Sequence, residues 1–411
     1  MLRIDKIMKQ KLRHMLVDSV WSIMGLVIMN MVLQLVVYKF WNMKLGNEIN
    51  GDVLTLMAYM NIFSISAGTA CNYLRMRHSQ DGYQGNTGYL HILWTFTPLA
   101  LVWSVGCVYL MGVQQSTWNS ILFALLSVFT MWRYYADVEY KLSLHYKQFF
   151  MYYLAIAGGY LLGSVLFWKT GMWPLGLLPG EIAGVLMVTV RGKVFRREHD
   201  SVDRRTMLHL WSAYIALMGP FLLNNVLFNG DRILLQSLLN GTNVTLYYQA
   251  SGIGKLMALL STPLNGVMIG YLARFDGQLS RKLMKWVTMI SLGVTILATA
   301  ATTLGAHIYI RVLYPDNYLV ERPWFLIASL TQVLFFVASS VTVVLLRFSP
   351  VWYQTAINIG YGAVYAALCI SLTRTYGFSG FAWGLLGANT VYMLFSLLLG
   401  WRDALRTPKD A

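Results

Sequence analysis

The segment GPFLLNNVLFNGDRILLQSLLNGTNVTLYYQASGIGKLMALLSTPLNG, residues 219–266, places Asp231, Arg232 and Lys255 inside or beside long apolar runs. A charge in the hydrocarbon of a bilayer costs from about 2.5 to over 10 kcal/mol by different estimates. Such side chains therefore usually face a bundle interior or a watery cavity, and they mark transport paths. The segment predicts a polar path inside a membrane protein.

The composition of the whole chain agrees with a membrane location. The 411 residues are 57% hydrophobic and 12% charged, whereas a soluble domain has about 25% charged residues. Uncharged apolar runs longer than the roughly 20 residues that cross a bilayer recur from end to end. The three cysteines have no paired spacing, so no disulfide framework and no metal site is expected. We therefore predict an all-α, multi-pass membrane protein without a cofactor.

About twelve transmembrane helices are expected. They cover roughly residues 16–38, 53–74, 89–111, 118–136, 149–168, 172–190, 207–239, 244–271, 284–310, 323–346, 351–373 and 377–401. The polar stretch RGKVFRREHDSVDRRTM, which begins at Arg191, separates the first six from the last six. We predict two six-helix lobes, residues 1–200 and 201–411, around a central cavity. The basic amphipathic start, MLRIDKIMKQKLRHM, predicts an interfacial helix that leads into a retained first span.

The distribution of basic residues predicts the orientation. Of the 32 Lys and Arg residues, 24 fall at the termini and in the connections of one side, and seven fall on the other side. Lys255 lies within the eighth span. Because cytoplasmic connections are enriched in Lys and Arg, both termini are expected in the cytoplasm. The same distribution explains most of the net charge of +15 without a nucleic-acid partner.

The two halves carry a weak internal similarity. LGNEINGDV, from Leu45, aligns with NGTNVTLYY, from Asn240, so that Gly46 corresponds to Gly241 and Ile49 to Val244. With six spans each, the halves have the same orientation. Parallel repeats of this kind form two lobes around a central substrate site.

Several segments resemble the polysaccharide flippases of the multidrug, oligosaccharidyl-lipid and polysaccharide exporter superfamily. The likeness is diffuse over most of the chain, and its most specific segments are MKLGNEINGDVLTLMAYMNI, GTACNYLRMRH, YYADVEYKLSLHYK, GDRILLQSLLNGTNVTLYYQASGIGKL, VLYPDNYLVERPW and YGFSGFAWG. The sequence departs from many members in the first span, which has VVYKFWN where they have a helix-end proline. The early charges of that span are only Arg13, His14 and Asp18.

The resemblance implies a function and a location. Members carry lipid-linked oligosaccharide from the inner to the outer leaflet, so the expected substrate here is a polyprenyl diphosphate sugar used for surface polysaccharide. The expected location is a bacterial cytoplasmic membrane. The expected partners are this substrate, membrane lipids, and a polysaccharide polymerase and glycosyltransferases.

Lys255 is the sharpest candidate for substrate binding. It lies about eleven residues into an apolar span, too deep to reach either surface easily, and a cation there suits a diphosphate headgroup. The alternative is a structural ion pair with Asp231 or a bond to a neighbouring carbonyl.

The role of Asp231 and Arg232 depends on the end of the seventh span. It ends near Phe228, or it continues through Pro220 to Leu239 and places both charges, with Asn225, inside the helix. Pro220 then permits a kink, which predicts a gate between the lobes. Arg232 and Asn225 are candidates for substrate binding and Asp231 for ion coupling, and the alternative is an interfacial ion pair at the outer rim.

Three further charges are candidates in the first half. Arg75 and Arg133 end the second and fourth spans at the inner side, where they contact substrate or, alternatively, only anchor the helices. Glu181 interrupts the sixth span between Gly180 and Gly184, which with Gly176 recur every four residues and predict a smooth packing face. Glu181 is expected to be either a proton site or the partner of another helix.

Two other functions remain open at this point. A multidrug or small-molecule exporter of the same superfamily needs acidic residues in an apolar cavity, whereas the deepest charge here is basic. A membrane-embedded polymerase or acyltransferase needs a long outer loop with clustered Arg and His, and the outer loops are short. We therefore expect a transporter and not an enzyme.

Overall fold

The computed structural model describes residues 20–21, 23–81, 85–112, 116–143, 145–196, 202–259, 268, 279–348 and 352–406. Nearly all of these residues are helical, and no strand occurs among them. Eight helices in the described part of the chain are long and apolar enough to cross a membrane. The predicted all-α membrane protein is thereby confirmed, but the count of twelve spans is not. The predicted interfacial helix at residues 1–15 lies outside the described residues.

Two of these eight helices are too long for one crossing. Ile23–Arg77 has 55 residues and Ala356–Leu405 has 50. At 1.5 Å per residue they are about 82 and 75 Å long, more than twice the thickness of a hydrocarbon core. A glycine with positive φ interrupts each, Gly46 at 75° and Gly377 at 60°. Each helix therefore has room for two of the predicted spans, one on either side of its glycine.

Two predicted spans correspond to short helices. The sixth was expected from residue 172, but α8 (Leu178–Arg191) begins only after the 3-10 helix Trp173–Gly176. Pro179 lies in the first turn of α8, where its missing N–H costs no helical hydrogen bond. Gly176 therefore does not share a helix face with Gly180 and Gly184, contrary to the prediction. The eighth span corresponds to α10 (Gly241–Leu259), and most of its expected continuation lies outside the described residues.

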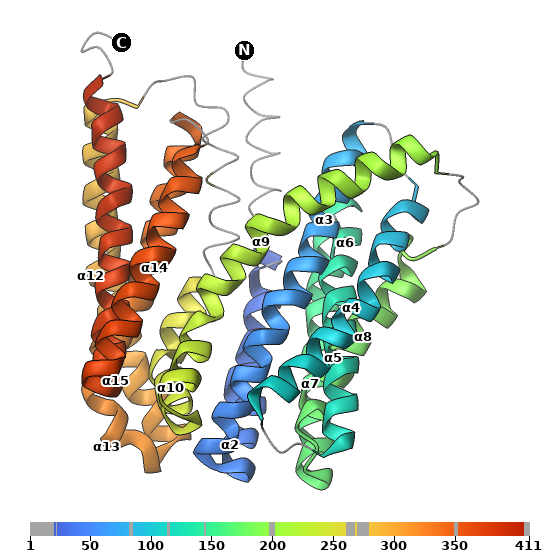
Figure 1. Cartoon of the computed structure of the whole chain (residues 1–411), viewed down its shortest axis with the longest axis horizontal. Helices are drawn as coiled ribbons and strands as arrows, with labels where there is room; N and C mark the ends of the chain where they lie inside the picture. The colour runs from blue at the N-terminus through green and yellow to red at the C-terminus, as the bar shows by residue number, and fades with distance from the viewer. Residues whose placement is uncertain are drawn as a thin grey trace. The chain divides into compact units, whose positions relative to one another are not determined.

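The chain divides into two compact units, Met1–Ile233 (unit 1) and Leu234–Ala411 (unit 2). The predicted lobe boundary at residue 200 and the central cavity stay predictions. Unit 1 contains the helices drawn from blue to green in Figure 1: η1 (Leu33–Val37), α2 (Tyr38–Met60), η2 (Asn61–Ile65), α3 (Ser66–Asp81), α4 (Thr87–Met111), α5 (Thr117–Ala136), α6 (Val138–Ser143), α7 (Tyr146–Thr170) and α8.

The core of unit 1 forms where α5, α7 and α8 pack together. Glycines permit the close approach of α7 to α8, because a Cβ on Gly159 would lie 2.4 Å from the Cα of Gly180. At one end of this core the indole of Trp173 contacts the rings of Trp41 and Phe123, with centroid distances of 5.7 and 5.3 Å. The buried pair described below lies in the same three-helix core.

Helix α9 (Arg204–Leu238) is continuous across Pro220 and contains the boundary between the units. The longer of the two predicted versions of the seventh span is thus correct, since α9 continues through these positions (Figure 1). Asp231 and Arg232 therefore lie within the helix. Large apolar side chains such as Leu208 and Ile215 remain exposed along it. An apolar exposed face is what lipid contact requires.

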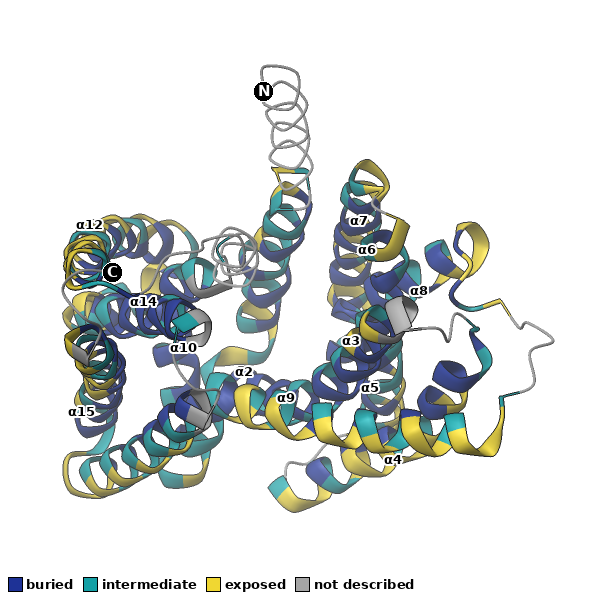
Figure 2. Ribbon diagram, turned by 90° about the horizontal axis from the view of Figure 1, so that it is seen from above, coloured by how far each residue is buried: buried dark blue, intermediate teal, exposed yellow. Residues whose placement is uncertain are grey.

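Unit 2 is arranged around α14 (Phe325–Phe348), which packs against three helices: α10, α12 (Arg281–Leu313) and α15 (Trp352–Arg406). Short elements join α12 to α14, namely the 3-10 helices Pro315–Asn317 and Arg322–Trp324 and, between them, α13 (Tyr318–Glu321). Much of α14 is buried, whereas α12 exposes Ile296, Leu297, Leu304 and Ile308 (Figure 2). The apolar outer face again suits a surrounding bilayer.

Candidate functional site

The predicted site residues occupy four separate places in the described structure. Arg133 and Glu181 form one buried pair in unit 1. A second group, Asn225, Asp231 and Arg232, lies in the C-terminal half of α9. Arg75 anchors a connection of unit 1, and Lys255 lies on α10 in unit 2.

The first place is a buried ion pair between α5 and α8. The Nε of Arg133 lies 2.5 Å from Oε2 of Glu181, and both side chains are almost fully buried. The hydroxyl of Tyr160 on α7 donates a hydrogen bond of 2.5 Å to the other carboxylate oxygen of Glu181. Glu181 also stands in the first turn of α8, where the helix dipole favours a negative charge. The carboxylate of Glu181 is therefore well compensated.

Packing around the pair holds the guanidinium in place. Its carbon lies 4.1 Å from the ring centroid of Tyr134, and the Tyr152 hydroxyl donates to the backbone carbonyl of Arg133 at 3.0 Å. A Cβ on Gly184 would lie 3.1 Å from the Arg133 side chain. The sequence marked Arg133 and Glu181 as independent candidates, and the fold brings them together. Of the two roles considered for Glu181, partner to another helix is the one that these contacts favour.

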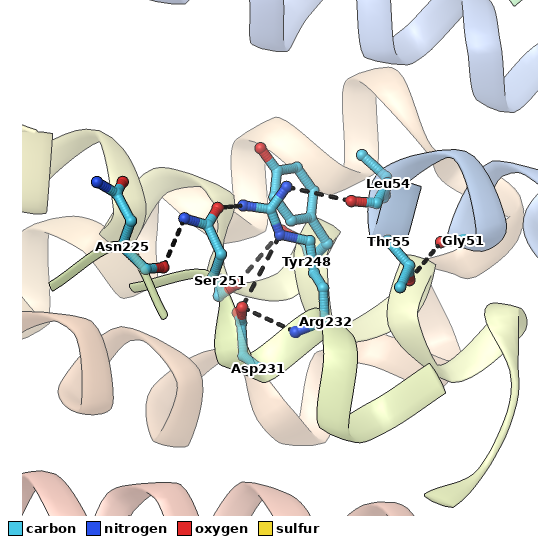
Figure 3. A network of polar contacts seen from close by, with 9 residues as sticks. Gly51, Leu54, Thr55, Asn225, Asp231, Arg232, Tyr248 and Ser251 are labelled. Atoms are coloured by element: carbon cyan, nitrogen blue, oxygen red, sulfur yellow. Dashed lines mark hydrogen bonds and ion pairs between the residues drawn. The ribbon is translucent and has the colours of Figure 1, made fainter. Parts of the chain in front are cut away.

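The second place is a polar group on α9, here named the polar stripe, in which Asn225, Asn229 and Arg232 follow one face of the helix and Asp231 precedes Arg232. Figure 3 labels Asn225, Asp231 and Arg232. The Nη1 of Arg232 donates to the carbonyl of Leu54 on α2 at 3.3 Å, and its Nη2 donates to Oδ1 of Asn229. Oδ1 of Asp231 accepts from the backbone N–H of Arg232 at 2.9 Å and lies 3.9 Å from its Nε. Arg232 and Asp231 are each 4% exposed, so this pair is buried and not at an open rim.

The stripe continues toward Pro220. The amide of Asn225 donates to the hydroxyl of Ser66 at 3.0 Å, at the start of α3, and Asn229 donates to the carbonyl of Asn225 at 2.8 Å. Ser66 follows the π-helical turn η2, and such turns are frequent at functional sites. Sequence reasoning missed Asn229. Its spacing of four residues from Asn225 and three from Arg232 would have placed it on their face of the helix.

The third place is an anchor for the connection between α8 and α9. Arg75 donates to the Tyr135 hydroxyl at 2.6 Å, to Oδ1 of Asn86, and to the carbonyl of Val194 at 3.5 Å. Asn86 in turn donates to the carbonyls of Lys193 and Arg196, each at 2.8 Å. Arg75 is thus committed to neutral acceptors inside unit 1. Substrate contact by Arg75 stays a prediction.

Glu139 completes this anchor. Its Oε2 accepts from the backbone N–H groups of Lys193 and Val194, at 2.7 and 3.0 Å. Neither Glu139 nor Asn86 was a candidate from sequence. Both lie near polar connections, where nothing in the residue pattern distinguishes an anchor from a solvated side chain.

The fourth place is Lys255, one turn before the described end of α10. The side chain is 4% exposed, and its Nζ lies 4.6 Å from the ring centroid of Tyr248 on the same helix. A cation over an aromatic face is stabilised by the ring quadrupole, more strongly when water is excluded. The cation is buried, as predicted, and its pairing with Asp231 stays a prediction. Among the described residues, no group of three His, Cys, Asp or Glu side chains is placed to hold a metal.

Comparison with known proteins identifies the fold of this chain. No protein-family model matches the sequence, and no curated protein matches it. The structure is similar to an inward-facing multidrug resistance MATE family transporter of the MOP superfamily, with a TM-score of 0.66 and 14% identity over 95% of this chain and 100% of that one. It is also similar to the lipid II flippase MurJ in an inward closed conformation (0.62, 12%, covering 96% and 88%). A third similar structure is the Vibrio cholerae MATE transporter VcmN in the bent form (0.60, 12%, covering 96% and 97%). The chain therefore has the fold shared by MATE transporters of the MOP superfamily and the lipid II flippase MurJ, as the sequence resemblance predicted.

Proposed function

We propose that this protein moves a polyprenyl diphosphate-linked oligosaccharide from the inner to the outer leaflet by alternating access, for surface polysaccharide synthesis. The observation that carries the proposal is the buried stripe on α9. There α9, which exposes many apolar side chains, buries Arg232 and Asn229, and Asn229 donates to the backbone carbonyl of the half-buried Asn225. Guanidinium groups bind phosphate oxygens in a bidentate manner, and amides suit sugar hydroxyls. The likeness in fold to a lipid II flippase supports the same class of substrate.

The proposal gives each candidate residue a role. Arg232, Lys255 and Asn225 bind the headgroup within the membrane, and Arg75 meets it at the inner side. Asp231 exchanges partners during the cycle, which couples it to an ion, and Pro220 permits α9 to bend as a gate. Arg133 and Glu181 stay paired and hold α5 and α8 together. The polyprenyl tail stays in lipid. A polymerase and glycosyltransferases act before and after transport.

The membrane potential is a sufficient source of energy for such a substrate. Moving one elementary charge across a potential of 100 mV corresponds to about 2.3 kcal/mol. A diphosphate headgroup carries about two negative charges, so its movement responds strongly to the field. ATP is not required by this scheme.

The test is reconstitution in vesicles with a fluorescent polyprenyl diphosphate oligosaccharide and an impermeant quencher. The wild type should expose the label at the opposite leaflet, and Lys255→Ala and Arg232→Gln should each slow this about tenfold or more, which corresponds to about 1.4 kcal/mol of lost interaction. Lys255→Arg keeps the charge and serves as the matched control.

Two outcomes separate the function from the site. If the wild type leaves the lipid in place but expels a cationic dye, the protein is a multidrug exporter of the same fold. If the wild type moves the lipid and Lys255→Ala moves it equally fast, the function stands and the assignment of Lys255 is wrong.

A further inference from the structure

The buried acidic side chains of the described structure differ in how they are compensated. Glu181 has Arg133 and Tyr160, Asp231 has the backbone and guanidinium of Arg232, and Asp137 accepts from Asn72 and Lys141. Glu321 is the most deeply buried of the four, at 1% exposure. Among the residues that the structure describes, neither of its carboxylate oxygens has a hydrogen-bond partner. No role considered so far uses Glu321.

Glu321 is an acidic residue buried beside exposed apolar residues, the reverse of the usual arrangement at a protein surface. It is the last residue of α13, in the connection between α12 and α14 (Figure 1). The preceding residues, Leu319 and Val320, are strongly exposed, whereas the acid points into unit 2. An apolar exterior with an acidic interior has no packing advantage, because burying a carboxylate without donors is unfavourable. The arrangement therefore requires something that neutralises Glu321.

The groups that face Glu321 do not supply a positive charge. Tyr309 and Tyr314 on α12 lie within electrostatic reach of it, and they share a side-chain hydrogen bond. From α10, Tyr248 reaches the same two tyrosines, with Lys255 above its ring. On the connection itself Asp316 and Arg322 are exposed. On α12, Nδ1 of His307 lies 3.1 Å from the hydroxyl of Tyr318 in α13, and the guanidinium carbon of Arg311 lies 6.0 Å from the ring centroid of the same tyrosine. No described cation forms an ion pair with Glu321, which leaves a proton or a bound cation to neutralise it.

We propose that Glu321 is a proton-binding site that controls the position of α13. With a proton on Glu321, α13 packs over α10 and α12 as in this structure. When Glu321 releases its proton to water, its ionised carboxylate is unfavourable in the buried position. Helix α13 therefore moves outward, and the connection between α12 and α14 opens. The 3-10 helices on either side of α13, containing Pro315 and Pro323, let it move as a short unit.

This inference rests on the proposed function only where it gives the proton site a role in the transport cycle. In the orientation predicted from the Lys and Arg distribution, the connection lies on the outer side, so the outer pH would set whether α13 closes. A proton is preferred to a metal cation because the groups around the carboxylate are phenols, and among the described residues no group of three His, Cys, Asp or Glu side chains is placed to hold a metal.

The test is hydrogen–deuterium exchange of residues 314–325 in the detergent-solubilised protein, without substrate, at a series of pH values. After correction for intrinsic exchange, protection of this segment in the wild type should fall as pH rises. Glu321→Gln, which mimics the protonated acid, should keep the segment protected throughout. Asp316→Asn, which removes an exposed acid of the same connection, should behave like the wild type.

Three results would overturn the proposal: equal protection of wild type and Glu321→Gln at every pH, an Asp316→Asn effect as large as that of Glu321→Gln, or protection that depends on sodium and not on pH. None of these results depends on which substrate is carried. In vesicles, the pH dependence of lipid movement should be lost in Glu321→Gln and kept in Asp316→Asn. If the wild type moves no lipid while the exchange results hold, the proposed function fails and the proton site stands.

Discussion

Glu181 in unit 1 and Glu321 in unit 2 are equally hidden from water but differently supported. Glu181 lies between an arginine, a tyrosine hydroxyl and a helix N-terminus, whereas neither oxygen of Glu321 has a hydrogen-bond partner. Burial alone therefore does not reveal the role of an acidic residue. A carboxylate with donors contributes to the fold as an ion, and one without donors depends on a proton or a ligand.

The largest expected effect on stability concerns Glu181, the carboxylate that has partners. Glu181→Gln leaves the guanidinium of Arg133 buried without its counter-ion, which should lower the free energy of unfolding by about 3–5 kcal/mol. Denaturation of the purified protein in lipid nanodiscs measures this. The double variant Arg133→Met with Glu181→Met removes both charges and should recover most of the loss. A double variant as unstable as Glu181→Gln would show that the pair is not what stabilises this core.

The next effect concerns the neutral donor to the same carboxylate. Tyr160→Phe removes the hydrogen bond to the charged Glu181 and should cost about 1.5–3 kcal/mol of unfolding free energy. Tyr152→Phe, about two turns earlier in α7, removes only a bond to the backbone carbonyl of Arg133 and should cost about 0.5–1.5 kcal/mol. Equal costs for the two variants would mean that Tyr160 does not compensate the charge.

A third effect tests the close packing that brings α7 and α8 together around the pair. Gly159→Ala places a methyl group 2.4 Å from the Cα of Gly180, so about 1–3 kcal/mol of destabilisation is expected. The neighbouring Gly158 has nothing within 4 Å of an added Cβ, and Gly158→Ala should instead stabilise by about 0.5–1 kcal/mol. Thermal unfolding in detergent compares the two. Destabilisation by Gly158→Ala as large as by Gly159→Ala would contradict this packing.

The smallest effect on stability is expected for Glu321, the carboxylate without hydrogen-bond partners among the described residues. Glu321→Gln removes no hydrogen bond and no ion pair, so the free energy of unfolding at neutral pH should change by less than about 1 kcal/mol. The same nanodisc measurement, run beside Glu181→Gln, makes the comparison direct. A loss of several kcal/mol would mean that Glu321 is ionised and supported in the folded protein.

Sequence reasoning reached the fold further than the site. It placed the breaks between the first and second spans and between the last two spans near Gly46 and Gly377, where the structure has its positive-φ glycines. It failed at the sixth span, where the proline-containing 3-10 helix Trp173–Gly176 delays the start of α8. Hydropathy cannot detect this, because the turn is as apolar as the helix.

The amino-acid sequence by itself determined that this protein crosses a membrane many times as helices. Transfer into hydrocarbon depends on each residue's own polarity, and lipid leaves the backbone no other partners than its own. Which groups the buried charges contact follows only from how the helices pack in three dimensions. Arg133 and Glu181 are 48 residues apart, and Leu54 and Arg232 are 178 apart, so no local pattern links them. The sequence likewise does not show that Glu321 lacks a partner among the described residues, because this depends on which side chains the surrounding helices bring near its carboxylate.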